Sequence, residues 1–253
     1  MEKPVEKKYL PVREMTDAER VRIVKDVFRT VTGKYDFLNH FLSLRRDVAW
    51  RSFAVRKMRF SQTGRYLDVA TGTGDVAVSA ASRYPHIRVI GVDFVREMLK
   101  PGRAKIEENH LEDRISLLQG DALNLPFPDN SFDVSAIAFG LRNIPDKTGA
   151  LKEMIRVVAP GGQVMVLEMT FPRTPVLKGL YGLYLNQILP RLARLFSDNP
   201  AAYEYLGDSI TNFLPPDALA RLMENMGLAK VEKHALTLGI TYLHIGYKLE
   251  EKE

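Results

Sequence analysis

A glycine-rich stretch flanked by carboxylates is the part of the sequence best suited to bind a small molecule. An apolar run reaches Asp68, a helical pattern begins near Asp75, and the residues between them read Val-Ala-Thr-Gly-Thr-Gly. Gly72 and Gly74 permit positive φ angles and a close approach of the backbone to a ligand. The start of the following helix presents free N–H groups. This pattern is typical of a loop that holds a nucleotide-like cofactor. The alternative is a tight strand-to-helix turn that binds no ligand.

The charges beside the loop bear on which cofactor it holds. Gly72, Gly74 and Ala77 also satisfy G-x-G-x-x-A, a dinucleotide fingerprint, so a nicotinamide-dependent reductase is a competing hypothesis. The carboxylates of Asp68 and Asp75 would repel an anionic pyrophosphate, but they would attract the ammonium and sulfonium groups of S-adenosylmethionine. The sequence also lacks a Tyr-x-x-x-Lys pair. We therefore expect S-adenosylmethionine, with Asp68, Gly72 and Gly74 at its site.

Two further carboxylates follow strand-like runs. Asp93 ends Val-Ile-Gly-Val-Asp, where a carboxylate can accept hydrogen bonds from both ribose hydroxyls. Phe94 comes next and is included in the expected site. Asp121, in Gly-Asp-Ala, can accept a hydrogen bond from the adenine amino group. Because nicotinamide cofactors also contain adenosine, these residues predict an adenosine site without selecting the cofactor.

The elements that must position these residues alternate between strand and helix. Short apolar runs predict strands at 65–70, 88–92, 115–119, 132–139 and 163–168, and helical patterns predict helices at 76–83, 97–109 and 147–158. Such alternation specifies a mostly parallel sheet. Strands at 230–238 and 242–249 should close it as an antiparallel hairpin. The prediction is an α/β, Rossmann-like, seven-stranded sheet with a helical cap over 1–60, comprising a helix from Thr16 or Asp17 and a second from Tyr35 to Met58.

Bulk composition limits the class of protein. The chain has 253 residues, 45% of them apolar, and no cysteine, which fits one domain in a reducing compartment. We divide it into the cap (1–60), a cofactor-binding core (61–170), a helical insertion (171–228) and the final hairpin (229–253). The net charge of +5 is scattered, so we expect no nucleic-acid partner. Without a signal segment or membrane span, we predict a cytoplasmic protein. The five histidines lack metal-ligand spacing, so no metal is expected.

Several motifs resemble those of one enzyme family. The core from Asp68 to Glu168 looks like class I S-adenosylmethionine-dependent methyltransferases. The motifs Lys-Tyr-Asp-Phe-Leu-Asn from Lys34, Phe-Gly-Leu-Arg-Asn from Phe139 and Tyr-Glu-Tyr-Leu-Gly-Asp-Ser-Ile from Tyr203 resemble the quinone-biosynthesis C-methyltransferases, as does the proline-rich loop 125–133. That resemblance implies methylation of demethylmenaquinol or of a polyprenylated methoxy-benzoquinol. It also implies cofactor contacts from Thr73, Asp93, Asp121 and Ala122. Many relatives have serine where this chain has Ala138, so any side-chain contact from that position is lost.

Carbon methylation of a quinol requires a deprotonated ring oxygen that pushes electron density onto the neighbouring carbon. Arg142 is expected beside the acceptor, where a fixed guanidinium can stabilise the developing phenolate. Arginine is a poor base, so its predicted duty is electrostatic. An ion pair with Asp146 or Asp121 is the alternative. Asn143 can hold the ring hydroxyl, and Tyr35 is predicted to orient the cofactor or the acceptor.

The segment 175–196 is rich in leucine and tyrosine and is interrupted by polar residues, so we expect it to cover the carboxyl edge of the sheet rather than span a membrane. It is the candidate site for a prenyl tail, and Arg191 and Arg194 nearby could hold the protein at the inner face of a membrane. A buried helical hairpin or a homodimer contact is the alternative. A module that binds the nucleoside and regulates a partner is the remaining non-enzymatic hypothesis. Demethylmenaquinol is the preferred acceptor, by resemblance alone.

Overall fold

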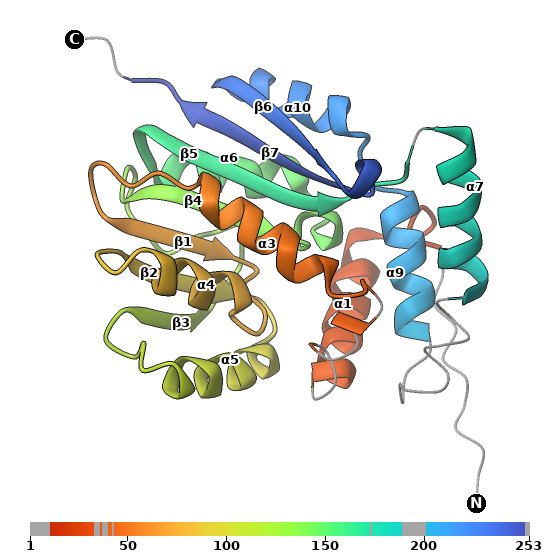
Figure 1. The fold of residues 1–253 in the computed structure, drawn as a ribbon, viewed down its shortest axis with the longest axis horizontal. Helices are drawn as coiled ribbons and strands as arrows, with labels where there is room; N and C mark the ends of the chain where they lie inside the picture. The colour runs from red at the N-terminus through yellow and green to blue at the C-terminus, as the bar shows by residue number, and fades with distance from the viewer. Residues whose placement is uncertain are drawn as a thin grey trace, which may run out of the picture.

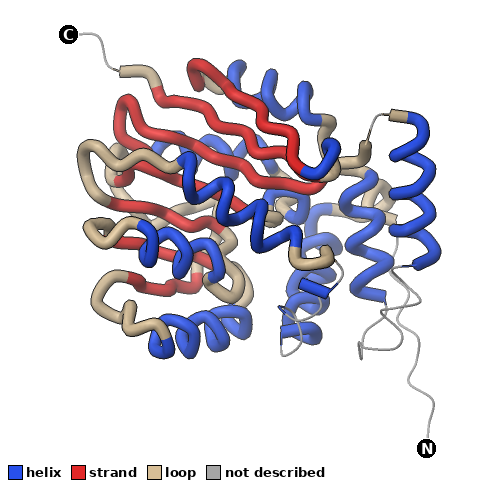
Figure 2. The backbone as a smooth tube through the Cα atoms, in the orientation of Figure 1, coloured by secondary structure: helices blue, strands red, loops and turns tan. Residues whose placement is uncertain are grey.

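A seven-stranded sheet forms the centre of the computed structural model, which describes residues 11–32, 36, 40–41, 43–172, 174–188 and 201–250. The strand order is β3-β2-β1-β4-β5-β7-β6. Figures 1 and 2 show the strands as one twisted layer with helices packed against both faces. The strands are β1 (Arg65–Val69), β2 (Arg88–Asp93), β3 (Ile115–Gln119), β4 (Phe132–Ala138), β5 (Val158–Met169), β6 (Leu228–Leu236) and β7 (Thr241–Lys248).

The pairing confirms the predicted topology. Strands β1 to β5 are parallel, and β7 runs antiparallel between β5 and β6. The central strand β1 is buried along almost its whole length because helices cover both faces, and parallel sheets require such cover. Two strands differ from the prediction by two or more residues at an end, and the others by at most one. Strand β5 begins at Val158, ahead of the turn at Pro160, and β6 ends at Leu236, where a 3₁₀ turn (η4, Thr237–Gly239) begins.

Helices cover the sheet in two groups, each with its own apolar core. Helices α3 (Arg46–Lys57), α4 (Asp75–Arg83) and α5 (Arg96–Glu108) pack on one face. Helices α6 (Lys147–Val157) and α10 (Pro216–Asn225) pack on the other. The predicted helices at 76–83, 97–109 and 147–158 therefore form to within one or two residues. Short apolar side chains such as Ala77 and Ala80 bring α4 close to the strands.

A third apolar cluster lies beyond the end of the sheet toward which the parallel strands point. It joins α1 (Asp17–Val31), α7 (Pro175–Leu183), the π-helical turn η3 (Tyr184–Ile188) and α9 (Ala201–Thr211). Thr16, one of the two helix starts that the sequence left open, caps α1 through two reciprocal hydrogen bonds with Glu19. This helical group covers the carboxyl edge of the sheet, the edge where ligands bind in open α/β folds.

One predicted helix is wrong in the part that can be compared. A single helix from Tyr35 to Met58 is interrupted at Leu44 and Arg45, whose φ angles of 51° and 59° are left-handed, and α3 begins only at Arg46. Most of residues 33–42 lie outside the described residues. Apolar periodicity continues across this break, which explains why it escaped notice in the sequence. No helix among the described residues is both long and apolar enough to cross a bilayer.

Candidate functional site

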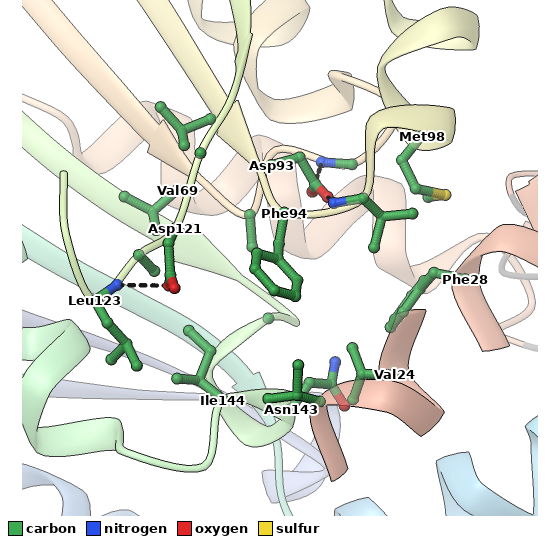
Figure 3. Close-up of a pocket in the computed structure, with 18 of the residues that line it drawn as sticks. Val24, Phe28, Val69, Asp93, Phe94, Met98, Asp121, Leu123, Asn143 and Ile144 are labelled. Carbon is green, nitrogen blue, oxygen red and sulfur yellow. Dashed lines mark hydrogen bonds between the residues drawn. The ribbon is translucent and has the colours of Figure 1, made fainter. Parts of the chain in front are cut away.

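A cavity lies at the carboxyl ends of β1 to β4. Its volume is about 900 Å³ when the open space at its mouth is included. Figure 3 shows side chains from four strand ends on one side of the cavity and α1 on the other. Its lining includes Val69, Ala70 and Gly72 after β1, Asp93 to Val95 after β2, Gly120 to Leu123 after β3, and Ala138 to Gly140 with Asn143 to Pro145 after β4.

Asp93 ties two of these strand ends together. One carboxylate oxygen accepts the N–H of Gly72 at 2.8 Å and the other accepts the N–H of Val95 at 2.8 Å. Burial raises the pKa of Asp93, and these two backbone bonds oppose that increase. A carboxylate offers about four lone-pair sites, so both oxygens can still accept a ligand hydroxyl. The backbone therefore fixes an acceptor of two hydrogen bonds at the wall of the cavity.

Asp68 lies behind the glycine loop rather than in the cavity wall. Its oxygens accept the Tyr66 hydroxyl at 2.8 Å and the Thr71 hydroxyl at 2.6 Å. Burial raises the pKa of Asp68 to about 6, because water no longer stabilises the charge. Gly74 caps α4 with a φ of 76° and, like Asp68, does not line the cavity. Gly72, whose φ is 56°, does line it.

A charged network surrounds the far side of the loop. Asp75 forms ion pairs with Lys105 and, at 3.3 Å, with Arg51. The Thr73 hydroxyl donates to Asp36 at 2.6 Å, and Lys105 pairs with the same carboxylate at 2.7 Å. Both cations are shared, because Arg51 also pairs with Asp47 and Lys105 also pairs with Asp36. Asp75 does not line the cavity, so the attraction that we expected it to exert on a cationic cofactor stays a prediction.

The remaining residues expected at the adenosine end border the cavity. Asp121 lies on its rim, where one carboxylate oxygen accepts the N–H of Leu123 at 2.9 Å (Figure 3). Ala122 and Phe94 also line the wall. The Phe94 ring takes a cation–π contact from Lys25 of α1, with the ammonium 4.1 Å from the ring centre. An aromatic face and an acidic rim provide suitable contacts for an adenine ring.

The opposite end of the cavity is built by the loop after β4. Phe139 adopts a left-handed φ of 58°, and Gly140 follows where any Cβ would lie only 2.7 Å from that of Ala70. Glycine is needed there because the ends of β1 and β4 pack so closely. The 3₁₀ turn η2 (Leu141–Asn143) then brings Asn143 into the cavity wall.

Arg142 points away from the cavity into the protein. It forms a buried ion pair with Glu168 of β5 and donates to the carbonyl oxygen of Phe139 at 2.7 Å. Glu168 also accepts the backbone N–H of Arg142 at 3.1 Å. Asp146 and Asp121 were the ion-pair partners expected from the sequence, but Arg142 pairs with Glu168. Arg142 therefore holds the turn that presents Asn143, and Tyr35 lies outside the described residues.

Helix α1 supplies the wall that faces the strand ends, a role that sequence reasoning missed. Val21, Val24 and Phe28 line the cavity, while Ile23 and Val27 pack into the third apolar cluster. The sequence showed the apolar periodicity of this helix. It also showed that the apolar residues fall on two faces, and the second face was the signal that could have revealed a cavity wall. Apolar side chains at this position exclude water from a bound ligand.

The fold and the cavity together define a class I methyltransferase architecture. A possible histamine N-methyltransferase from Thermotoga maritima, described as S-adenosylmethionine-dependent, superposes with a TM-score of 0.61 at 22% identity, covering 88% of this chain and 98% of that one. A putative methyltransferase of Haloferax volcanii, solved with its Trm112 activator, gives 0.62 at 17% identity over 88% of this chain and 99% of that chain. These likenesses concern the fold.

Sequence comparison identifies the family. Residues 15–248 match the ubiE/COQ5 methyltransferase family, and the chain belongs to it. A ubiquinone/menaquinone biosynthesis C-methyltransferase UbiE of Geotalea daltonii is 42% identical over 91% of this chain and 98% of its own length. A demethylmenaquinone methyltransferase of Staphylococcus saprophyticus is 40% identical over 89% and 96%. The predicted family, methyltransferase class and S-adenosylmethionine cofactor are confirmed, and the reductase hypothesis is not supported.

Proposed function

We propose that this protein methylates a ring carbon of a polyprenyl quinol with S-adenosylmethionine, and that demethylmenaquinol is its acceptor. The observation that carries the proposal is one cavity with Asp93 and Asp121 at one end and Asn143 at the other. The menaquinone pathway appears in the names of both relatives described above, which supports a naphthoquinol acceptor. A methoxy-benzoquinol is the second candidate, because the Geotalea name also includes ubiquinone.

The residues present fit the methyl donor. Asp93 would accept the ribose hydroxyls, Asp121 and the neighbouring Ala122 would contact the adenine edge, and Phe94 would lie against its ring. Gly72 leaves room for close backbone approach, since even a Cβ there would meet only Met98 at 3.6 Å. When bound, S-adenosylmethionine supplies a methyl group on a positively charged sulfur. Thr73, Asp68 and Gly74 would act indirectly, by fixing the shape of the loop.

The acceptor end of the cavity would orient the quinol and keep water away. Asn143 would hold the ring oxygen, and Val21, Val24 and Phe28 would shield the reacting carbon. After the ring oxygen loses its proton, the ring carbon forms a bond to the methyl carbon as the carbon–sulfur bond breaks, with its electron pair going to sulfur. The carbon then loses its hydrogen as a proton and the oxygen regains one, so one proton is released overall.

Arg142 would contribute through position rather than contact. Its charge is neutralised by the ion pair with Glu168. Its main effect would therefore be to hold the η2 turn, and with it Asn143, in a fixed position. We retain Tyr35 as a proposed contact of the cofactor or acceptor, on the family resemblance alone.

Helix α7 offers a surface for the prenyl tail and for the membrane that contains it. Val176, Leu180 and Leu183 recur on one side of the helix, and their exposed fractions are 75%, 61% and 45%. Helix α7 contains no acidic residue, and its lysine, Lys178, is exposed. We propose that this face rests on the inner surface of a membrane while the tail reaches the cavity. Arg191 and Arg194, expected to assist, lie outside the described residues.

A vesicle assay tests this surface. Leu180→Ser should reduce sedimentation with anionic phospholipid vesicles, whereas Leu249→Ser, equally exposed at 61% near the other end of the chain, should not. Equal binding by both variants would contradict membrane contact through α7. Light scattering on the same samples reports whether the face instead joins two copies of the chain, the dimer alternative.

The acceptor is tested with a panel of quinols. The protein is incubated with S-adenosylmethionine labelled in its methyl group and with reduced demethylmenaquinol, methoxy-benzoquinol or no acceptor. We expect the label in the naphthoquinol extract. Label in neither quinol would contradict the proposed function, and label only in the benzoquinol would replace the preferred acceptor.

A further inference from the structure

Asn143 carries both a hydrogen-bond donor and an acceptor on one small side chain. Its amide nitrogen donates and its amide oxygen accepts, so the group that faces the cavity decides what the site can recognise. The surrounding hydrogen bonds must determine which way such an amide points. Asn143 is only 7% exposed, so its environment restricts it closely.

Tyr205 of α9 supplies the decisive bond. Its buried hydroxyl donates to the amide oxygen of Asn143 at 3.2 Å. This contact joins a helix of the third apolar cluster to the turn after β4, and no feature of the local sequence around Asn143 indicates it. A tyrosine hydroxyl can also accept a hydrogen bond, so the charges around it determine the direction of its proton.

Arg20 of α1 is the charged residue beside this hydroxyl. Its guanidinium donates to the backbone carbonyl oxygen of Arg142, next to Asn143. Burial raises the pKa of Tyr205, and the nearby charge of Arg20 acts against that increase, as does that of Arg142. A guanidinium is positively charged and has no acceptor, so it favours a Tyr205 hydroxyl whose lone pairs, rather than its proton, lie on the side of Arg20. The hydroxyl proton is then directed toward Asn143.

We propose that Arg20 and Tyr205 are positioning residues that fix the Asn143 amide with its N–H₂ group toward the cavity. Figure 3 shows the amide nitrogen of Asn143 directed to the side of Phe94 and its oxygen directed away. Three residues make this arrangement: Tyr205 donates to Asn143, and Arg20 donates to the neighbouring carbonyl oxygen of Arg142. Each member lies on a different element, α1, α9 and η2, so the arrangement forms only when the helical group is docked.

A donor at this point selects the ionisation state of the acceptor, an inference that rests on the proposed function. An N–H group binds a deprotonated ring oxygen more strongly than a neutral hydroxyl, because bonds to charged acceptors are the stronger ones. The amide therefore lowers the pKa of the bound quinol. As the new carbon–carbon bond forms, the ring oxygen keeps its bond to Asn143 while electron density moves toward the carbon.

The test compares two tyrosines of the same cluster. Tyr205→Phe keeps the ring and removes the hydroxyl, and Tyr181→Phe is the control, because the Tyr181 hydroxyl has no hydrogen-bond partner among the described residues. We expect Tyr205→Phe to lower kcat by about tenfold, with an unchanged Kd for S-adenosylmethionine and an unchanged melting temperature. The rise of kcat with pH should also have a higher apparent pKa in Tyr205→Phe than in the wild type, because the bound quinol loses its proton less readily. Tyr181→Phe should match the wild type in every measurement.

A double-mutant cycle separates positioning from general packing. In an Asn143→Ala background the hydroxyl has nothing to orient, so adding Tyr205→Phe should leave kcat unchanged. The same tenfold loss in that background, or wild-type kcat in Tyr205→Phe, would overturn the inference. Should Tyr205→Phe fold poorly, Arg20→Gln takes its place in the cycle. A wild-type protein that methylates no quinol would instead overturn the proposed function, which distinguishes the two failures.

Discussion

Replacing Asp93 with asparagine isolates the charge that the cofactor site is proposed to use. The substitution keeps the shape of the side chain, but it converts one of the two oxygens that accept Gly72 N and Val95 N into a donor. A bond to a charged group contributes about 1.5–3 kcal/mol, so losing the charge beneath two ribose hydroxyls costs at least about 3 kcal/mol of binding. Because about 1.4 kcal/mol is a factor of ten, the Kd for S-adenosylmethionine should rise by about 100-fold or more.

Asp133 provides a matched control. It is a buried carboxylate that accepts backbone N–H groups of Gln62, Thr63 and Gly64, and it does not line the cavity. Asp133→Asn should therefore lose comparable backbone bonds and some stability, yet bind the cofactor as the wild type does. Titration calorimetry is run at a temperature where circular dichroism shows every variant folded. A Kd for Asp93→Asn within about threefold of wild type would refute the assigned role.

Three other substitutions or titrations follow from the structure. Arg142→Ala should destabilise the fold by about 3–5 kcal/mol in urea unfolding, because it leaves Glu168 buried without its partner, and Arg142→Met with Glu168→Gln should recover most of this. The pKa of Asp68 is raised to about 6, so this carboxyl adds stability below pH 4 that is lost as the pH rises through 6. Between those limits the free energy of unfolding of the wild type should fall by up to about 3 kcal/mol relative to that of Asp68→Asn. Parallel plots of unfolding free energy against pH for the two proteins would contradict this. The pKa of His244 is lowered to about 4 by burial, so its stabilising effect, full above pH 6.5, should disappear as pH falls through 4, and NMR should show the ring neutral at pH 5.5.

The sequence predicted the sheet well because its signals are local. Short apolar runs, glycine turns and helix caps each depend on a few neighbouring residues, and alternation of strands with crossover helices implies a parallel sheet. The helix cap at Thr16 and the adenosine-side residues Asp93 and Asp121 were located for the same reason: each adjoins the end of one recognisable element. The break at Leu44 and Arg45 was invisible because ordinary side chains occupy its left-handed positions.

Contacts between distant elements could not be predicted in this way. The pairing of Arg142 with Glu168 joins residues 26 positions apart, and Tyr205 meets Asn143 across 62. Contacts between residues so far apart in the chain produce no periodic pattern in a single sequence. The ion pairs of Asp75 with Arg51 and Lys105 were hidden for the same reason, since both partners lie on other helices. The motifs located the site. Only the packing of distant elements showed which of its residues line the cavity and which support those that do.

The central claim is transfer of a methyl group to a ring carbon, and the structure of the product tests it most directly. Protein, methyl-labelled S-adenosylmethionine and reduced demethylmenaquinol with a short tail are incubated, and the extracted product is examined by NMR and mass spectrometry. The account predicts one labelled methyl group bonded to the quinone ring carbon, with Asn143→Ala greatly slowing its appearance. A labelled methyl on oxygen, or no labelled product from a folded protein that binds the cofactor, would contradict it.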